Sequence, residues 1–157
     1  MRECELSIQV DEPFGGRLDQ AWLRRVVEET LATAGVSAPV ELGLVVTDAE
    51  TVRRLNRSYR GRDEATDVLS FALLEDHEAS FVAPPDGVLH LGEVLLSYPQ
   101  AEAQAREQGH TVEWEVALLV VHGVLHLLGY GHEDDEGEAR MQATSDLVLA
   151  RVAAEKR

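Results

Sequence analysis

The amino-acid sequence predicts an α+β fold, in which a small mixed four-stranded sheet is covered by about five helices. Segments with the alternation of strands come early in the chain, and segments with helical periodicity cluster late. The chain has 157 residues, 45% of them hydrophobic, and is therefore long enough to bury a core of its own. Because no repeat or linker divides it, we expect residues 1–157 to form a single domain.

Four strands are expected along the chain. Residues 5–10 and 40–46 alternate apolar and polar side chains, as half-buried strands do. Residues 67–74, which are rich in apolar side chains, are the third expected strand, and residues 88–96 are the fourth. The polar segment between them, residues 77–86, contains proline and is expected to be a loop.

Helices are expected from apolar stripes and terminal residues, at residues 18–34, 47–59, 97–109, 111–129 and 137–155. The second is expected to begin with a capping box formed by Thr47 and Glu50, and to bury Val52, Leu55 and Tyr59. The expected apolar stripe of the last helix comprises Ala139, Ala143, Leu147, Ala150 and Ala154. Glycine, which commonly ends a helix, stands at the end of the first four, at Gly35, Gly61, Gly109 and Gly129.

The composition excludes several classes of protein. No segment approaches the run of about 20 apolar residues that spans a bilayer. The N-terminal segment lacks the apolar block of a secretory signal. Cys4 is the only cysteine, so no internal disulfide can form. These features predict a cytoplasmic protein that does not associate with a membrane.

The formal net charge of −15 argues against a broad phosphate-binding surface. Positive charge is nevertheless concentrated in one segment, which contains Arg53, Arg54, Arg57, Arg60 and Arg62. Arginine is well suited to bidentate contact with phosphate. Any contact with nucleic acid is therefore expected to be local and to involve this segment.

Three histidines, His122, His126 and His132, have the spacing of a metal site. Residues four apart on a helix lie on the same face, so His122 and His126 can direct ring nitrogens to one point. Gly129 allows a left-handed turn that returns His132 toward that point. Three neutral imidazoles leave one position of a tetrahedral zinc ion open, as in catalytic sites. We therefore expect one Zn²⁺ per chain, although nickel, cobalt or copper also bind such ligands.

The same spacing occurs in the metzincin peptidases, where a glutamate beside the first histidine is the general base. This chain has Gly123 at that position. Unrelated histidines on this apolar helix would need buried hydrogen-bond partners, which favours the metal interpretation. The sequence therefore predicts a metzincin-like three-histidine site without the residue that peptide hydrolysis uses.

Two motifs resemble those of the bacterial YbeY family of metal-dependent endoribonucleases. One is His-Gly-x-Leu-His-Leu-x-Gly-Tyr-x-His at residues 122–132. The other is Leu-Asn-x-x-Tyr-Arg at residues 55–60, followed by Thr-Asp-Val-Leu-Ser-Phe at residues 66–71. The resemblance covers nearly the whole chain. It departs from the family at Gly131, where aspartate is usual, and at residues 93–94, where Asp-Ile is usual.

The resemblance implies a mixed sheet with surrounding helices, zinc held by the three histidines, and cleavage of single-stranded rRNA. It also implies maturation of the 3′ end of small-subunit (16S) rRNA and a role in ribosome quality control. The implied partners are the small ribosomal subunit and its assembly proteins. The expected mechanism is that zinc lowers the pKa of a bound water. Either that water or the RNA 2′-hydroxyl then attacks the phosphate.

Arg60 matches the family arginine implicated in activity and is the expected catalytic residue, because a guanidinium there would clamp the scissile phosphate. Arg57 and Arg62 are candidates for RNA contact, although Arg57 also fits the solvent-facing side of its helix. Asp67 and Ser70 are expected to brace the strand behind the site.

Two alternatives to the nuclease remain open. One is a zinc-containing ribosome assembly factor without nuclease turnover, in which zinc stabilises the fold. The other is a metal-dependent hydrolase of another bond, such as a peptide, which would need a base to replace the glutamate absent at Gly123.

Overall fold

The structure is a computed structural model, which describes residues 4–61, 66–72, 88–130 and 134–153. Its strands are β1 (Cys4–Val10), β2 (Val40–Thr47), β3 (Val68–Ala72) and β4 (Leu89–Ser97). Its helices are α1 (Gln20–Thr33), α2 (Ala49–Arg60), α3 (Tyr98–Gln108), α4 (Val112–Leu127) and α5 (Asp135–Val152), with a short 3-10 helix η1 (Glu12–Phe14) after β1. The predicted α+β fold is confirmed.

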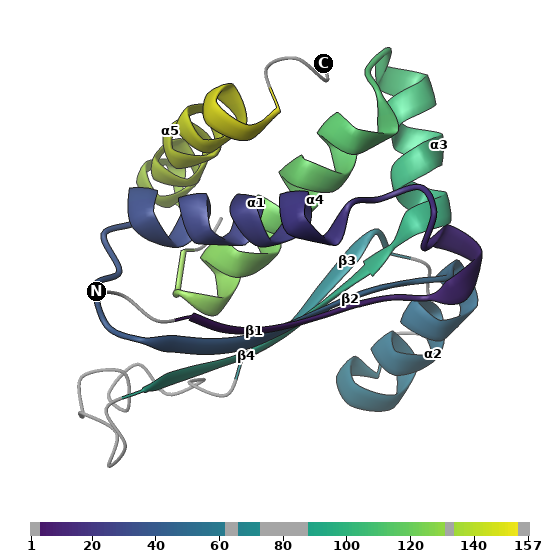
Figure 1. Cartoon of the computed structure of the whole chain (residues 1–157), viewed down its shortest axis with the longest axis horizontal. Coiled ribbons are helices and arrows are strands. Elements are labelled where there is room, and N and C mark those ends of the chain that lie inside the picture. The colour runs from purple at the N-terminus through teal and green to yellow at the C-terminus, as the bar shows by residue number, and fades with distance from the viewer. Residues whose placement is uncertain (1–3, 62–65, 73–87, 131–133, 154–157) are drawn as a thin grey trace.

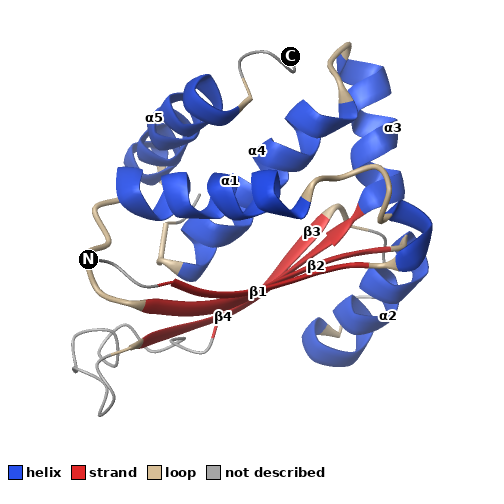
Figure 2. Cartoon of the chain, in the orientation of Figure 1, coloured by secondary structure: helices blue, strands red, loops and turns tan. Residues whose placement is uncertain are grey.

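The sheet is mixed, with the strand order β1-β2-β4-β3 (Figure 2). β1 and β2 are parallel, as are β2 and β4, whereas β3 runs antiparallel to β4 and forms one edge. The alternation noted in the sequence places Leu42, Leu44 and Val46 of β2 in the core. The sheet is therefore half-buried in the way its residue pattern predicts.

The two faces of the sheet are covered unequally (Figure 1). α1, α4 and α5 lie on one face with the main core, to which α4 contributes Val120 and Val124. α2 lies on the opposite face, where Val52 packs with Leu69 and Leu95 in a smaller cluster over one end of the sheet. The helix with His122 and His126 (α4, the histidine helix) and the helix with Arg57 and Arg60 (α2) are therefore on opposite faces of the sheet.

The predicted signals at the helix ends are largely confirmed. The side chains of Ser97 and Thr111 accept hydrogen bonds from the first turns of α3 and α4. Gly61 and Gly109 adopt positive φ angles of 71° and 77° and end α2 and α3.

The start of α2 was predicted one residue too early. The N-cap is Asp48, whose carboxylate accepts a hydrogen bond from the backbone N–H of Thr51 at 2.6 Å. The hydrogen bonds from Thr51 hold the pKa of Asp48 below its usual range. Thr47 instead belongs to β2, and its buried hydroxyl donates to Asp11. The expected burial of Tyr59 was also wrong, since this side chain is 72% exposed.

The buried side of α5 was predicted wrongly as well. Ala139, Ala143 and Ala150 are exposed, as is Leu147. The residues that face the core are Met141, Ser145, Val148, Leu149 and Val152. Both sets have helical spacing, and the second buries the larger apolar side chains, which contributes more to stability than burying alanine does. Ala154 and the expected loop at residues 77–86 lie outside the described residues.

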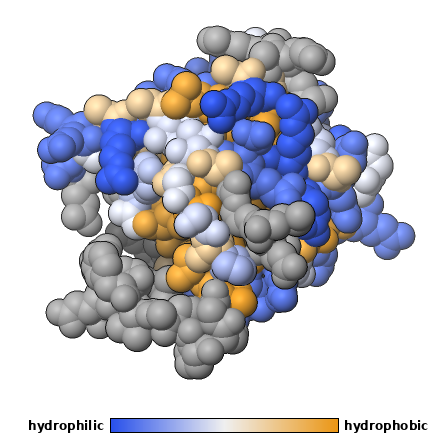
Figure 3. Space-filling model, turned by 60° about the vertical axis from the view of Figure 1, so that its left-hand side comes forward, coloured by the Kyte–Doolittle hydropathy of each residue, from blue (hydrophilic) through white to orange (hydrophobic). Residues whose placement is uncertain are grey.

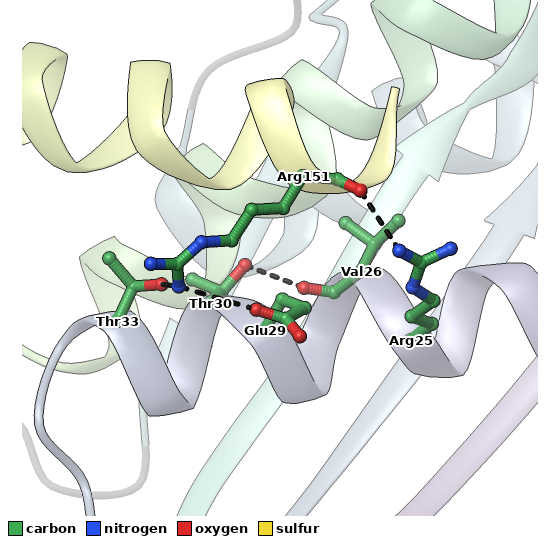
Figure 4. Close-up of polar contacts among 6 residues, drawn as sticks. All are labelled: Arg25, Val26, Glu29, Thr30, Thr33 and Arg151. Carbon is green, nitrogen blue, oxygen red and sulfur yellow. Dashed lines mark hydrogen bonds and ion pairs between the residues drawn. The ribbon is translucent and has the colours of Figure 1, made fainter. Parts of the chain in front are cut away.

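Polar contacts also join α5 to α1 (Figure 4). The Arg25 guanidinium donates to the Arg151 carbonyl at 2.9 Å, and Nη1 of Arg151 lies 3.5 Å from the Glu29 carboxylate. Arg151 also donates to the Thr33 hydroxyl at 3.3 Å. Because these contacts are exposed, the apolar packing beneath them contributes more to holding the two helices together.

None of the described helices is long and apolar enough to span a bilayer. On the side of the molecule seen in Figure 3, hydrophobic residues gather near the centre, with hydrophilic residues to the left and right of them.

Candidate functional site

His122 and His126 lie in the last two turns of α4. The helix begins at Val112, after the N-cap Thr111, and is apolar over most of its length, so much of it is buried in the main core. Toward its C-terminal end the exposure rises: His122 is half-buried and His126 is exposed. Because they are four residues apart on one helix, the two imidazoles share a face. The structure thus brings together two of the three predicted ligands beside solvent.

The chain leaves α4 through the turn that the sequence predicts. Gly129 has a φ of 96°, which L-residues with a side chain rarely adopt. Its N–H donates to the His126 carbonyl at 3.0 Å, and the N–H of Tyr130 donates to the Leu125 carbonyl at 3.0 Å. These are the two hydrogen bonds of a Schellman motif, which reverses the chain after a helix.

His132 lies outside the described residues, as does Gly131. The complete three-histidine metal site therefore stays a prediction. Among the residues that the structure describes, no three histidine, cysteine, aspartate or glutamate side chains come together as a metal site.

Gly123 has a packing role that the sequence did not reveal. A Cβ atom at this position would lie 2.6 Å from Cγ1 of Val94 and 3.4 Å from the hydroxyl of Ser70. α4 thus lies directly against β4 and β3 at this point. A glutamate of the metzincin kind does not fit here unless the helix separates from the sheet, because real Cβ contacts are longer than 3.0 Å.

Ser70 and Asp67 brace the site as the sequence predicts. The hydroxyl of Ser70 donates to the carbonyl of Gly123 at 3.0 Å and so ties β3 to the histidine helix. The Asp67 carboxylate accepts a hydrogen bond from the Gln104 amide at 3.1 Å, and its carbonyl accepts one from the N–H of Ser97 at 2.9 Å. β3 is therefore held to α3, α4 and β4 together.

A buried acid lies on the same side of α4, seven residues before His122. Glu115 is only 4% exposed, and its Oε1 lies 3.3 Å from Nε2 of His110. Burial raises the pKa of the Glu115 carboxyl, and the contact with His110 opposes that shift. The ring of Trp114 covers His110 at a centroid distance of 4.2 Å. The sequence showed Glu115 only as a favourable acid in the first turn and did not reveal its burial.

Helix α2, which contains Arg57 and Arg60, lies on the other face of the sheet. Arg57 is exposed on α2, in agreement with a solvent-facing helix side. Arg60 is the last residue of α2, immediately before the left-handed Gly61. The side chain of Arg60 and the whole of Arg62 lie outside the described parts of the chain. The expected role of Arg60 as a clamp on the scissile phosphate stays a prediction.

The other histidines lack ligand geometry in the described residues. His90 lies on β4, where its Nδ1 is 3.0 Å from a carboxylate oxygen of Glu41 on β2. His110 contacts Glu115 as described above. His77 lies outside the described residues.

The sequence is similar to one family of known proteins over nearly its whole length. Residues 10–153 match the family described as Endoribonuclease YbeY. A protein of that name from Dehalococcoides mccartyi (strain CBDB1) is 43% identical over 157 residues, covering 96% of this chain and 95% of the relative. A protein of the same name from Roseiflexus castenholzii is 47% identical over 148 residues, covering 94% of this chain and 92% of the relative.

A solved structure has a similar fold. The solution structure of a Thermotoga maritima protein superposes with a TM-score of 0.60 at 25% sequence identity. The superposition covers 96% of this chain and 93% of that protein. The arrangement of sheet and helices described above is therefore shared along both chains.

Proposed function

This chain belongs to the YbeY family of endoribonucleases, and from that membership we propose that it is a single-strand-specific, metal-dependent endoribonuclease. Its proposed role is maturation of the 3′ end of 16S rRNA and ribosome quality control in the cytoplasm. The structural observation that carries the proposal is the pair of histidines at the solvent-facing end of α4, followed by the reversing turn at Gly129.

The proposed metal ligands are His122, His126 and His132. The donor set suits zinc, which binds imidazole nitrogen readily and forms catalytic sites with three protein ligands. The exposure gradient along α4 also suits a catalytic ion, since His126 is open to solvent and His122 is anchored at the edge of the core. The Schellman turn at Gly129 supports a third ligand at His132, because a motif of this kind reverses the chain after a helix.

A zinc ion held there supplies Lewis acidity, which polarises a phosphodiester bond. Arg60 is proposed to pair with the phosphate and to neutralise the negative charge that develops on it. The packing of Gly123 against Val94 supports RNA over peptide as the substrate, because it leaves no space for the metzincin base. Arg57 and Arg62 are proposed to contact neighbouring phosphates.

The net charge of −15 supports a protein-assisted encounter with RNA. Free RNA is repelled by an acidic protein unless positive charge is concentrated at the contact. We therefore propose that the small ribosomal subunit and its assembly proteins present the single-stranded rRNA to the enzyme. Single strands are favoured because their backbones can bend into a narrow site.

The deciding experiment measures cleavage of a single-stranded fragment from the 3′ end of 16S rRNA. Wild-type protein is compared with His126→Ala and with His90→Ala, which removes a histidine that has no ligand spacing. We expect loss of cleavage on the order of 100-fold or more for His126→Ala and less than about twofold for His90→Ala. Equal activity of both variants would sink the nuclease proposal, since cleavage would then come from a contaminant.

Arg60→Ala separates the nuclease from the assembly factor. Loss of a phosphate clamp lowers the rate of cleavage by about 100-fold or more while zinc content, measured by metal analysis, stays unchanged. An assembly factor without turnover would support ribosome maturation equally well with alanine at this position. Normal ribosome maturation in the Arg60→Ala variant would therefore favour the assembly factor over the nuclease.

A further inference from the structure

The face of the sheet that does not carry α4 contains an open groove. Its volume is about 860 Å³, and it runs across β1, β2 and β4 toward α2. α2 covers one end of this face (Figure 1). Residues of β1, β2 and β4 line the groove beyond α2. The groove is separate from the histidine site, because the sheet lies between them.

One end of the groove is acidic. Glu5, Glu41 and Glu93 come from three neighbouring strands, line the groove together and are exposed. None of the described residues that line it is a lysine or an arginine. The Glu41 carboxylate also contacts His90 at 3.0 Å, so it is held in place at the rim.

The other end of the groove is apolar and aromatic. Val45, Leu55 and Leu95 line it where α2 meets the sheet. Tyr59 stands above them at 72% exposure, with its ring edge-on to Phe71 at a centroid distance of 5.3 Å. An exposed tyrosine resting on a second ring is the kind of anchor that dominates binding energy at protein interfaces.

A row of residues across the sheet joins the two ends. Ser7 pairs in register with Gly43, Gly43 with Glu93, and Glu93 with Phe71. Because Gly43 has no side chain, the Glu93 side chain lies over it, with Cγ 3.4 Å from the position that a Cβ would take. The row therefore joins the carboxylates to the aromatic pair in one continuous surface.

We propose that this groove is a docking surface for a basic, extended segment of a protein partner. Arginine or lysine side chains of the segment pair with Glu5, Glu41 and Glu93, and an apolar side chain packs against Tyr59 and Phe71. The charge of the groove favours a basic peptide over a nucleic acid. The described lining residues offer three carboxylates and no cation, so they would repel the phosphates of a nucleic acid and attract the cationic side chains of a basic peptide.

The test uses a fluorescein-labelled peptide, Arg-Gly-Arg-Gly-Arg-Gly-Leu-Phe, and fluorescence anisotropy at physiological salt. Two groove variants are compared with wild type: Tyr59→Ala, and the double variant Glu41→Gln with Glu93→Gln. The matched control is Glu138→Gln with Asp146→Asn, which removes the same charge from the exposed side of α5. We expect Kd to rise by about tenfold or more in both groove variants and by less than about twofold in the control.

Three outcomes overturn the proposal. The first is absence of measurable peptide binding to wild type. The second is an equal loss in the groove and control charge variants, which would mean attraction by net charge alone. The third is binding of a labelled single-stranded RNA that the groove variants lose, which would make this face an RNA surface. His126→Ala should bind the peptide as wild type does, so failure of the nuclease proposal remains distinguishable.

Discussion

At the scale of single residues, Gly123 determines how closely α4 approaches the sheet. The position lies between two predicted metal ligands in sequence, yet its structural contacts are with Val94 and Ser70 on the strands. The distance between the histidine helix and the edge strand β3 therefore depends on a residue that has no side chain.

Gly123→Ala should destabilise the fold. Alanine gains about 1 kcal/mol of helix propensity, but the new Cβ would lie 2.6 Å from the buried Val94. Overpacking of this kind costs about 1–3 kcal/mol, and β-branched valine cannot move aside easily. Urea denaturation measures the net loss. In a double-mutant cycle, Val94→Ala should relieve the cost, whereas an effect of Gly123→Ala that is the same with valine and with alanine at position 94 would contradict the close approach.

Glu115 gives the fold a pH dependence with a defined sign. Because burial raises the pKa of this carboxyl above its ordinary value of 4.5, the folded chain binds its proton more tightly than the unfolded chain does. The contribution of Glu115 to the free energy of unfolding therefore falls as the pH rises from 4.5 through the raised pKa. Urea titrations at several pH values should show wild type losing stability relative to Glu115→Gln over that window.

The matched control for this titration is Glu138→Gln, which removes an exposed acid from α5. The Glu115→Gln difference from wild type is read against the difference measured for this control at each pH. A Glu115→Gln difference that does not change with pH, or that favours wild type as the pH rises, would show that burial does not govern this carboxyl.

At the scale of elements, the ends of the helices position the site. α3 and α4 both lead into glycines with positive φ, Gly109 at 77° and Gly129 at 96°. Only the second is followed by a predicted metal ligand, His132. Both glycines are therefore needed for a positive φ angle, but only Gly129 is expected to direct the chain toward a metal ligand.

Gly129→Ala and Gly109→Ala form a matched pair. Each places a side chain in the left-handed region and should lower the free energy of unfolding by about 1–2 kcal/mol. Only Gly129→Ala should also weaken zinc binding, because it disturbs the turn toward His132. Competition with a chromophoric chelator measures the affinity. Equal zinc affinities in the two variants would argue against a ligand beyond this turn.

At the scale of the whole molecule, we expect the core to hold without a metal ion. α4 is buried through apolar contacts with the sheet and with α1 and α5, and its N-terminal half lies far along the helix from the histidines. A zinc ion at the open end of α4 would then contribute to stability through binding alone, about 2.7 kcal/mol when zinc is present at 100 times its Kd.

Removal of zinc by a chelator should leave the chain folded. Circular dichroism should keep its native shape, with a lower melting temperature that returns when zinc is added back. Loss of the cooperative transition after chelation would instead identify a structural metal and favour the assembly-factor alternative.

Most of the fold could be predicted from the sequence, because strand alternation, helix caps and helix-ending glycines act within a few residues of one another. Every described strand and α-helix was expected within a few residues of its bounds, whereas the short helix η1 was not expected. Ambiguous local patterns led to errors: α5 carries two possible stripes, and Thr47 was taken as the cap in place of Asp48.

The sequence by itself determined the histidine spacing, the left-handed turn at Gly129 and the family to which the chain belongs. The tertiary structure decided the burial of Glu115, the contact between Gly123 and Val94, and the placement of α2 and α4 on opposite faces of the sheet. The first set depends on neighbours along the chain. The second depends on contacts between segments distant in sequence, which form only when the whole core is packed.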